Sequence, residues 1–95
     1  MITKKGYIIR SGSFYASGFT DSGYKYFTWT SEVGEAMILI SLDRAKDFLE
    51  VATKKAKERL DLLRLDRAWM QELVDLHEAA KITEATITYD LKEID

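Results

Sequence analysis

The chain of 95 residues has no cysteine, no proline and a single histidine. Without cysteine, a disulfide framework and a thiolate metal site are both excluded, which fits an intracellular protein. His77 alone cannot anchor a typical zinc or transition-metal site. No apolar stretch approaches the roughly 20 residues of a membrane-spanning helix. We therefore expect a cytoplasmic protein that has no cofactor, no metal and no membrane segment.

Positive charge and nucleotide-binding motifs are also scarce. The formal net charge is −2, whereas nonspecific nucleic-acid affinity comes from clustered lysine and arginine, so nucleic acid is not the expected partner. The serines among the early glycines match neither the Gly-x-Gly-x-x-Gly nor the Walker pattern, and turn chemistry explains them. His77 is expected to be a partly exposed helix residue rather than a general base. The sequence therefore predicts a protein that is not an enzyme.

The first forty residues hold all five glycines and are predicted to form strands. Residues 7–10, 13–19 and 24–30 are separated by turns at 11–12 and 20–23, where glycine supplies the positive φ that tight turns require. This pattern predicts a three-stranded meander. The apolar run at residues 37–40 predicts a buried fourth strand, and the alternation at residues 85–91 predicts a final, half-buried strand.

Residues 41–81 contain neither glycine nor proline and are predicted to be helical, with Ser41 as the first cap. Apolar residues at spacings of three and four define one stripe of Ala45, Phe48, Leu49, Ala52, Ala56, Leu60 and Leu63, and a second of Leu62, Leu65, Trp69, Leu73, Leu76 and Ala80. Two helices are favoured, with a change of direction within residues 61–67 and Asp66 capping the second. One unbroken helix is the alternative, and it would imply a homodimer through the helices.

These elements predict one α+β domain over residues 1–95, in the order β-β-β-β-α-α-β. Its antiparallel sheet consists of the three-stranded N-terminal meander, the fourth strand and the C-terminal strand. The sheet is expected to pack against two helices or one long helix, because helices gather on an antiparallel sheet in this class of fold.

The two predicted turns also fix a register for the meander. Because side chains alternate between the two faces of a strand, one face collects Phe14, Ala16, Phe27 and Trp29 as the core. The other face collects an outer aromatic set that comprises Tyr15, Phe19, Tyr24 and Tyr26, with Arg10 and Lys25 nearby. A sheet needs only one apolar face to pack on helices, so these six residues are the candidate partner-binding or ligand-binding site. The alternative is that a helix or a second subunit covers this face.

The first half of the chain resembles a group of phage proteins. The stretches that carry the resemblance are Tyr7-Ile-Ile-Arg10, Phe14-Tyr-Ala-Ser-Gly-Phe19, Tyr26-Phe-Thr-Trp-Thr-Ser31, Glu35-Ala36 and Ser41-Leu-Asp-Arg-Ala45. They are similar to small uncharacterised proteins encoded by bacteriophages and prophages of Gram-positive bacteria. The resemblance implies a setting in the cytoplasm of a host cell, where accessory phage proteins of this size commonly bind and block host machinery. It carries no functional residues over.

The outer aromatic set and the resemblance together favour a non-enzymatic phage protein that inhibits a host factor by stoichiometric binding. The expected partner is a component of an anti-phage defence system, so the protein would act in the manner of an anti-CRISPR protein. A second hypothesis is a protein that sequesters a nucleotide signal, with Arg10, Lys25 and the tyrosines around an anionic ring-bearing ligand. A third is a module that stacks single-stranded nucleic acid on the tyrosines, since stacking is worth about 1 to 3 kcal/mol per base.

Overall fold

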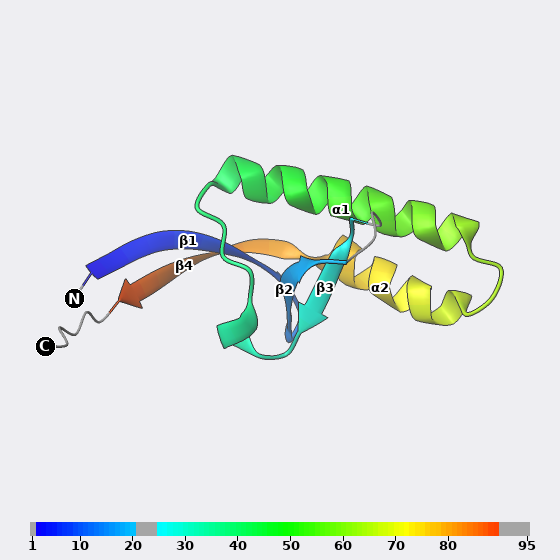
Figure 1. Cartoon of the computed structure of the whole chain (residues 1–95), viewed down its shortest axis with the longest axis horizontal. Coiled ribbons are helices and arrows are strands. Elements are labelled where there is room, and N and C mark those ends of the chain that lie inside the picture. Colours follow the sequence, from blue (N-terminus) through cyan, green and yellow to red (C-terminus); the bar gives the residue numbers. More distant parts are fainter. Residues whose placement is uncertain (1, 21–24, 90–95) are drawn as a thin grey trace, which may run out of the picture.

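The computed structural model of the chain describes residues 2–20 and 25–89 and shows an α+β fold, which confirms the predicted class. One antiparallel sheet has the strand order β3-β2-β1-β4, and two helices pack against it (Figure 1). The elements are β1 (Ile2–Ser11), β2 (Phe14–Phe19), β3 (Phe27–Thr30), the short 3-10 helix η1 (Val33–Glu35), α1 (Leu42–Leu62), α2 (Arg67–Ala79) and β4 (Lys81–Tyr89).

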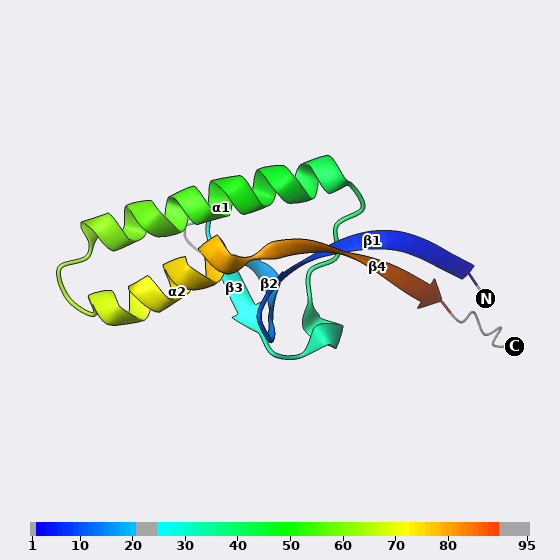
Figure 2. The same ribbon diagram turned by 180° about the vertical axis from the view of Figure 1, so that it is seen from behind.

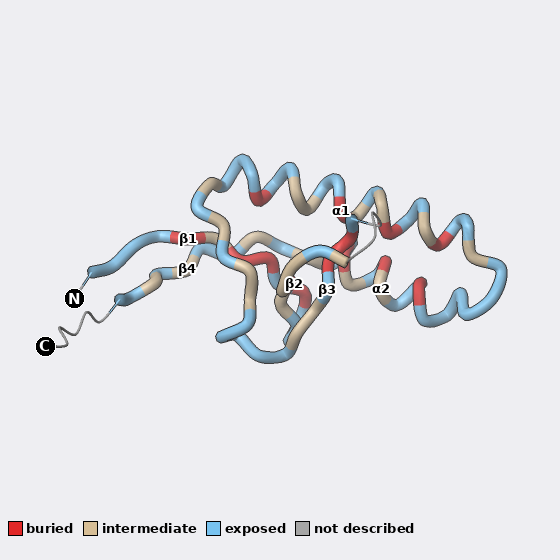
Figure 3. The backbone as a smooth tube through the Cα atoms, viewed as in Figure 1, coloured by how far each residue is buried: buried red, intermediate tan, exposed pale blue. Residues whose placement is uncertain are grey.

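The molecule is elongated, with extents of 58 × 27 × 24 Å. The α1–α2 hairpin extends past the sheet at one end, and a two-stranded ribbon of β1 and β4 extends at the other (Figures 1 and 2). Buried residues concentrate in the middle, where helices and sheet overlap, whereas both ends are mostly exposed (Figure 3). Its radius of gyration of 15.5 Å exceeds the roughly 12 Å of a compact domain of this length.

The predicted fourth strand forms only one antiparallel bridge. β1 pairs with β2 only near the turn, at Arg10↔Tyr15 and Ser11↔Phe14. Farther from the turn, β2 no longer pairs with β1. Leu39 pairs with β1 there, through two backbone hydrogen bonds with Tyr7 at 2.7 and 2.8 Å. The run at residues 37–40 therefore joins the sheet through this bridge and through a hydrogen bond from the Met37 N–H to the Ala16 carbonyl at 2.8 Å, and Ile40 stays exposed.

The predicted register of the second hairpin is wrong. The structure pairs Ala16 with Trp29 and Phe19 with Phe27, with an irregularity between Ala16 and Gly18. Two causes act together. The loop is closed by a hydrogen bond from the Thr20 N–H to the Tyr26 carbonyl at 2.9 Å, so it is longer than the expected four-residue turn. The irregularity then adds one residue to β2, which moves Phe19 to the face of Phe27.

The two-helix prediction is confirmed, as is the cap of α1. The Ser41 hydroxyl accepts from the Arg44 N–H at 3.3 Å. The prediction for Asp66 is wrong in its chemistry, because this residue precedes α2 in a left-handed conformation (φ 58°) and its side chain makes no capping bond. The Arg67 guanidinium instead donates to the carbonyls of Leu60 and Leu63, at 2.9 and 2.8 Å, and so satisfies the C-terminal end of α1.

The core consists of two clusters under α1. The first joins β1, β2 and β3 to the first half of α1 through Ile9, Ala16, Phe27 and Ala52. The second joins the two helices to the start of β3 through Tyr26, Ala56, Leu60, Met70 and Val74. The predicted stripe of α1 is thus confirmed as its packed face. Neither helix in the described part of the chain is long and apolar enough to cross a membrane.

Candidate functional site

The six predicted site residues do not form one surface. Tyr26 is only 5% exposed and belongs to the core between the helices. Phe19 faces the helices, where its ring packs against Phe27 and Phe48 at centroid distances of 5.1 and 5.4 Å. The prediction of a shared outer face is therefore wrong for both. Phe19 was misplaced by the wrong register, and Tyr26 precedes β3, which begins at Phe27, so strand alternation does not apply to it. Tyr24 lies outside the described residues.

The remaining predicted residues fall into two separate places. Arg10 and Tyr15 lie together, with the guanidinium carbon 5.9 Å from the centroid of the tyrosine ring. The Arg10 Nε also donates to the Gly12 carbonyl at 2.8 Å, which fixes the guanidinium over this turn. Lys25 lies instead beside Phe19, and both line an apolar cavity of about 450 Å³ with Phe48. Arg10 lines no part of that cavity, so the two cations do not bracket a common ligand.

His77 occupies the centre of the molecule, which corrects the expectation of a partly exposed residue. It is 1% exposed, and its ring is stacked on Phe27 at a centroid distance of 5.5 Å and an interplanar angle of 4°. Tyr26 and Trp29 contact it edge-on, at centroid distances of 6.1 and 5.2 Å. Three aromatic residues of the second hairpin thus surround one side chain of α2.

Both nitrogens of His77 are engaged with the backbone. The Phe27 N–H donates to Nε2 at 2.9 Å, so Nε2 carries no proton. The proton therefore lies on Nδ1, which donates to the Leu73 carbonyl at 2.7 Å. Burial lowers the pKa of His77 below its ordinary value of 6.5, although the hydrogen bond to Leu73 opposes this shift. With no free nitrogen, His77 fastens β3 to α2 and is not placed to act as a general base.

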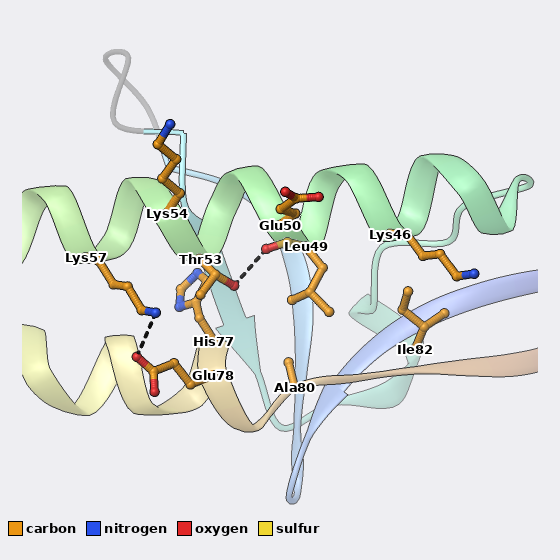
Figure 4. A pocket seen from close by; sticks show the side chains of 10 residues that line it. All are labelled: Lys46, Leu49, Glu50, Thr53, Lys54, Lys57, His77, Glu78, Ala80 and Ile82. Atoms are coloured by element: carbon orange, nitrogen blue, oxygen red, sulfur yellow. Dashed lines mark hydrogen bonds and ion pairs between the residues drawn. The ribbon is translucent and has the colours of Figure 1, made fainter.

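An open groove of about 680 Å³ lies between α1 and the junction of α2 with β4 (Figure 4). Its floor is formed by Ala80 and Ile82, and Leu49 of α1 lies above them. Cations and carboxylates alternate along its rim, where Lys57 and Glu78 form an ion pair at 3.2 Å. No group of three or more potential metal-binding side chains exists within residues 2–20 and 25–89. The charges along the groove are of both signs, so they do not indicate a ligand of one particular charge.

Three exposed apolar side chains lie at the turn of the helical hairpin. Leu62, Leu65 and Trp69 are 75%, 79% and 57% exposed, and we call these three residues the hairpin tip. They begin the second predicted stripe, but α2 buries Met70, Val74 and His77 instead. The packed face of α2 is thus turned by one residue from the predicted stripe, which leaves Trp69 in solvent, whereas Leu62 ends α1 and Leu65 lies in the loop between the helices.

Sequence reasoning missed both the burial of His77 and the exposure of Trp69 for one reason. Met70, Val74 and His77 also recur at spacings of four and three, so the sequence contained two possible packed faces for α2. A face that ends in histidine is less apolar than one with leucine and tryptophan. The structure buries the face with His77, where the imidazole accepts a hydrogen bond from the buried N–H of Phe27.

The chain was compared with protein-family models, with curated proteins and with solved structures, and none of the three comparisons finds a match.

Proposed function

We propose that this protein acts by stoichiometric binding to another protein, without catalysis, and that the hairpin tip is its contact surface. The observation that supports this is the exposure of Trp69 together with Leu62 and Leu65, which are close to it in the sequence at the turn between the helices. Tryptophan is enriched among the residues that dominate binding energy at protein interfaces. Apolar side chains are stabilised by burial, so their exposure does not contribute to the stability of the fold and is better explained by contact with a partner.

The surroundings of the hairpin tip also fit an interface. Charged side chains surround it, because Asp61, Arg64 and Asp66 are all exposed. A polar rim around an apolar centre is typical of protein interfaces. The tip also projects beyond the sheet, so a partner can approach it without meeting the rest of the molecule (Figure 1).

The partner that we propose is a host protein in an anti-phage defence system, such as a CRISPR effector. This part of the proposal rests on the resemblance of the first half of the chain to small phage-encoded proteins. The protein would then inhibit its target in the host cytoplasm by occupying one of the target's surfaces. The nucleotide-sequestering and nucleic-acid-stacking alternatives are less favoured, because Tyr26 is buried and Arg10 and Lys25 lie apart.

The experiment is a pull-down from host lysate with the tagged protein, followed by calorimetry with the purified partner. We expect one specific partner that saturates near one molecule per chain. Binding should be lost in the double variant Leu65→Ala, Trp69→Ala. The matched control is Val33→Ala, because Val33 is 63% exposed on η1, away from the helical hairpin.

Two results would contradict the proposal. In one, the double variant folds and binds its partner like the wild type, which would exclude the hairpin tip. In the other, light scattering shows that the wild type self-associates through the tip and that the double variant does not. The three side chains would then form the homodimer through the helices that the sequence allowed.

A further inference from the structure

The outer edge of β4 is long and has few of the features that block edge pairing. β4 lies at the end of the sheet and, in the described part of the chain, pairs only with β1. Edge strands are usually protected by proline, by inward-pointing charge, by bulges or by being short. The strand Lys81–Tyr89 runs for nine residues without proline, and its only charged residues are Lys81 and Glu84. Its pairing with β1 is continuous, with no bulge.

The backbone groups that face this edge follow from the pairing of Tyr7. Tyr7 exchanges both of its backbone hydrogen bonds with Leu39, on the side of β1 away from β4. Tyr7 and Glu84 are therefore a non-hydrogen-bonded pair, in which the N–H and C=O of Glu84 point away from β1. Because directions alternate along a strand, the residues with outward N–H and C=O groups are Ile82, Glu84, Thr86 and Thr88.

There is space beside this edge for another strand. The groove under α1 is open along the start of β4, with Ile82 on its floor and Leu49 above it (Figure 4). At the other end, the ribbon of β1 and β4 extends past the helices with Ile2 and Tyr89 half exposed (Figure 1). An isolated two-stranded ribbon is marginally stable in water, so it gains from further strands.

We propose that β4 pairs antiparallel with β4 of a second copy of this chain, which joins two sheets into one of eight strands. The two-fold axis passes through Ala85, since this register is centred on β4 and pairs all nine of its residues. Hydrogen bonds then form between outward-facing residues only, with Ile82 opposite Thr88 and Glu84 opposite Thr86 of the second copy. A strand that pairs with itself in this way gives a closed, symmetric dimer.

Charge and size favour a second copy in this register. A shift of the axis by one residue, to Glu84, would place the two Glu84 carboxylates opposite each other, which is destabilising. With Ala85 at the axis, Glu84 faces a neutral threonine and Lys81 faces Tyr89. The alanine itself is the smallest side chain of the strand, so the closest cross-strand contact at the axis is easily accommodated.

The first test measures mass by light scattering over a concentration series for three forms of the protein. The wild type should be a dimer at tens of micromolar. Thr86→Pro should be a monomer, because proline removes an outward N–H while the bonds to β1 remain. Thr86→Ala retains that N–H and should remain a dimer. Circular dichroism of each form checks that the fold is intact.

The second test uses the absence of cysteine from the chain. Ala85 would face its symmetry mate in a non-hydrogen-bonded pair, with Cα atoms about 4.5 Å apart, which is close enough for a disulfide. Ala85→Cys should therefore crosslink on mild oxidation. Thr83→Cys lies on the same face, but in this register position 83 faces Ile87 of the second copy. The two introduced cysteines are therefore four residues apart along the strand and should not crosslink.

The outcomes separate this proposal from others. A wild-type monomer at every concentration would overturn it. A dimer that persists in Thr86→Pro and does not crosslink through Ala85→Cys would also overturn it and assign self-association to another surface. Neither result depends on the hairpin tip, so the proposed function is tested separately.

Discussion

The middle of the molecule and its two ends are built differently. In the middle, Phe27, Met70 and His77 are fully buried, and the side chains of sheet and helices interlock around them. At the ends, the hairpin tip and the β1–β4 ribbon expose leucine, tryptophan, isoleucine and tyrosine. The largest fully buried side chains therefore lie in the middle, as expected of the region that provides stability. Partner contacts are assigned to the exposed ends, although Val33, Ile40 and Val51 are exposed as well. Substitutions in the two regions should separate these roles.

The largest effect on stability is expected for Phe27→Ala in the middle. Phe27 is 1% exposed and contacts Phe19, Trp29 and His77. Removing a buried phenylalanine side chain leaves a cavity and typically costs about 3 to 5 kcal/mol. Phe14→Ala is the matched control, because this ring of the same sheet is 42% exposed and should cost well under half as much. Urea unfolding measures both, and equal costs would contradict the division between middle and surface.

A smaller loss is expected at the boundary between the middle and the ribbon. A Cβ on Gly6 would lie 2.8 Å from Ile38 Cγ2 and 2.8 Å from Ile87 Cδ1. Gly6→Ala therefore forces both isoleucine side chains to move. Both contacts are to side-chain atoms and Ile38 is half exposed, so we expect a cost at the low end for overpacking, about 1 kcal/mol. Gly34→Ala is the control, since its Cβ would meet no atom within 4 Å. If thermal unfolding gave the same midpoint for both variants, Ile38 would not be firmly packed on the ribbon.

The His77 contact predicts a pH dependence of stability. Because the folded pKa lies below the unfolded value of 6.5, the unfolded chain binds a proton first as the pH falls. Stability is therefore complete above about pH 6.5 and declines below it, by up to about 1.4 kcal/mol per pH unit, until the folded pKa is reached. His77 is the only histidine, so His77→Gln should remove this decline between pH 6.5 and 5. An unchanged slope in chemical denaturation would contradict the assignment.

The fold class was predictable because its signals are local. Ser41 precedes an apolar stripe with a period of three to four residues, and the alternating residues before Tyr89 indicate a strand. The break between the helices was also anticipated within residues 61–67, although Asp66 does not cap α2 with its side chain. Signals of this kind depend only on residues that are close in the sequence, so they can be recognised from the sequence of a single protein.

The candidate site was not predictable because it depends on distant contacts. The register of β2 and β3 is set by a bulge near Ser17 and by the longer loop, and these decide whether Phe19 points to the helices or away. The packed face of α2 includes His77, whose hydrogen-bond partner Phe27 is 50 residues away in the sequence. Strand alternation allows Phe19 on either face of the sheet, and the helical period allows either of two packed faces for α2. Only the tertiary structure selects one in each case.

The smallest effect on stability is expected for Trp69→Ala at the hairpin tip, where we place the binding function. Trp69 is 57% exposed and belongs to neither core cluster. Surface substitutions of this kind usually change stability by no more than about 0.5 kcal/mol, whereas truncation of an interface tryptophan often costs about 2 kcal/mol or more of binding free energy. Denaturation and calorimetry on the same preparation measure the two quantities. A variant that unfolds much more readily, with unchanged affinity for its partner, would assign Trp69 to the core and remove the distinction between middle and end.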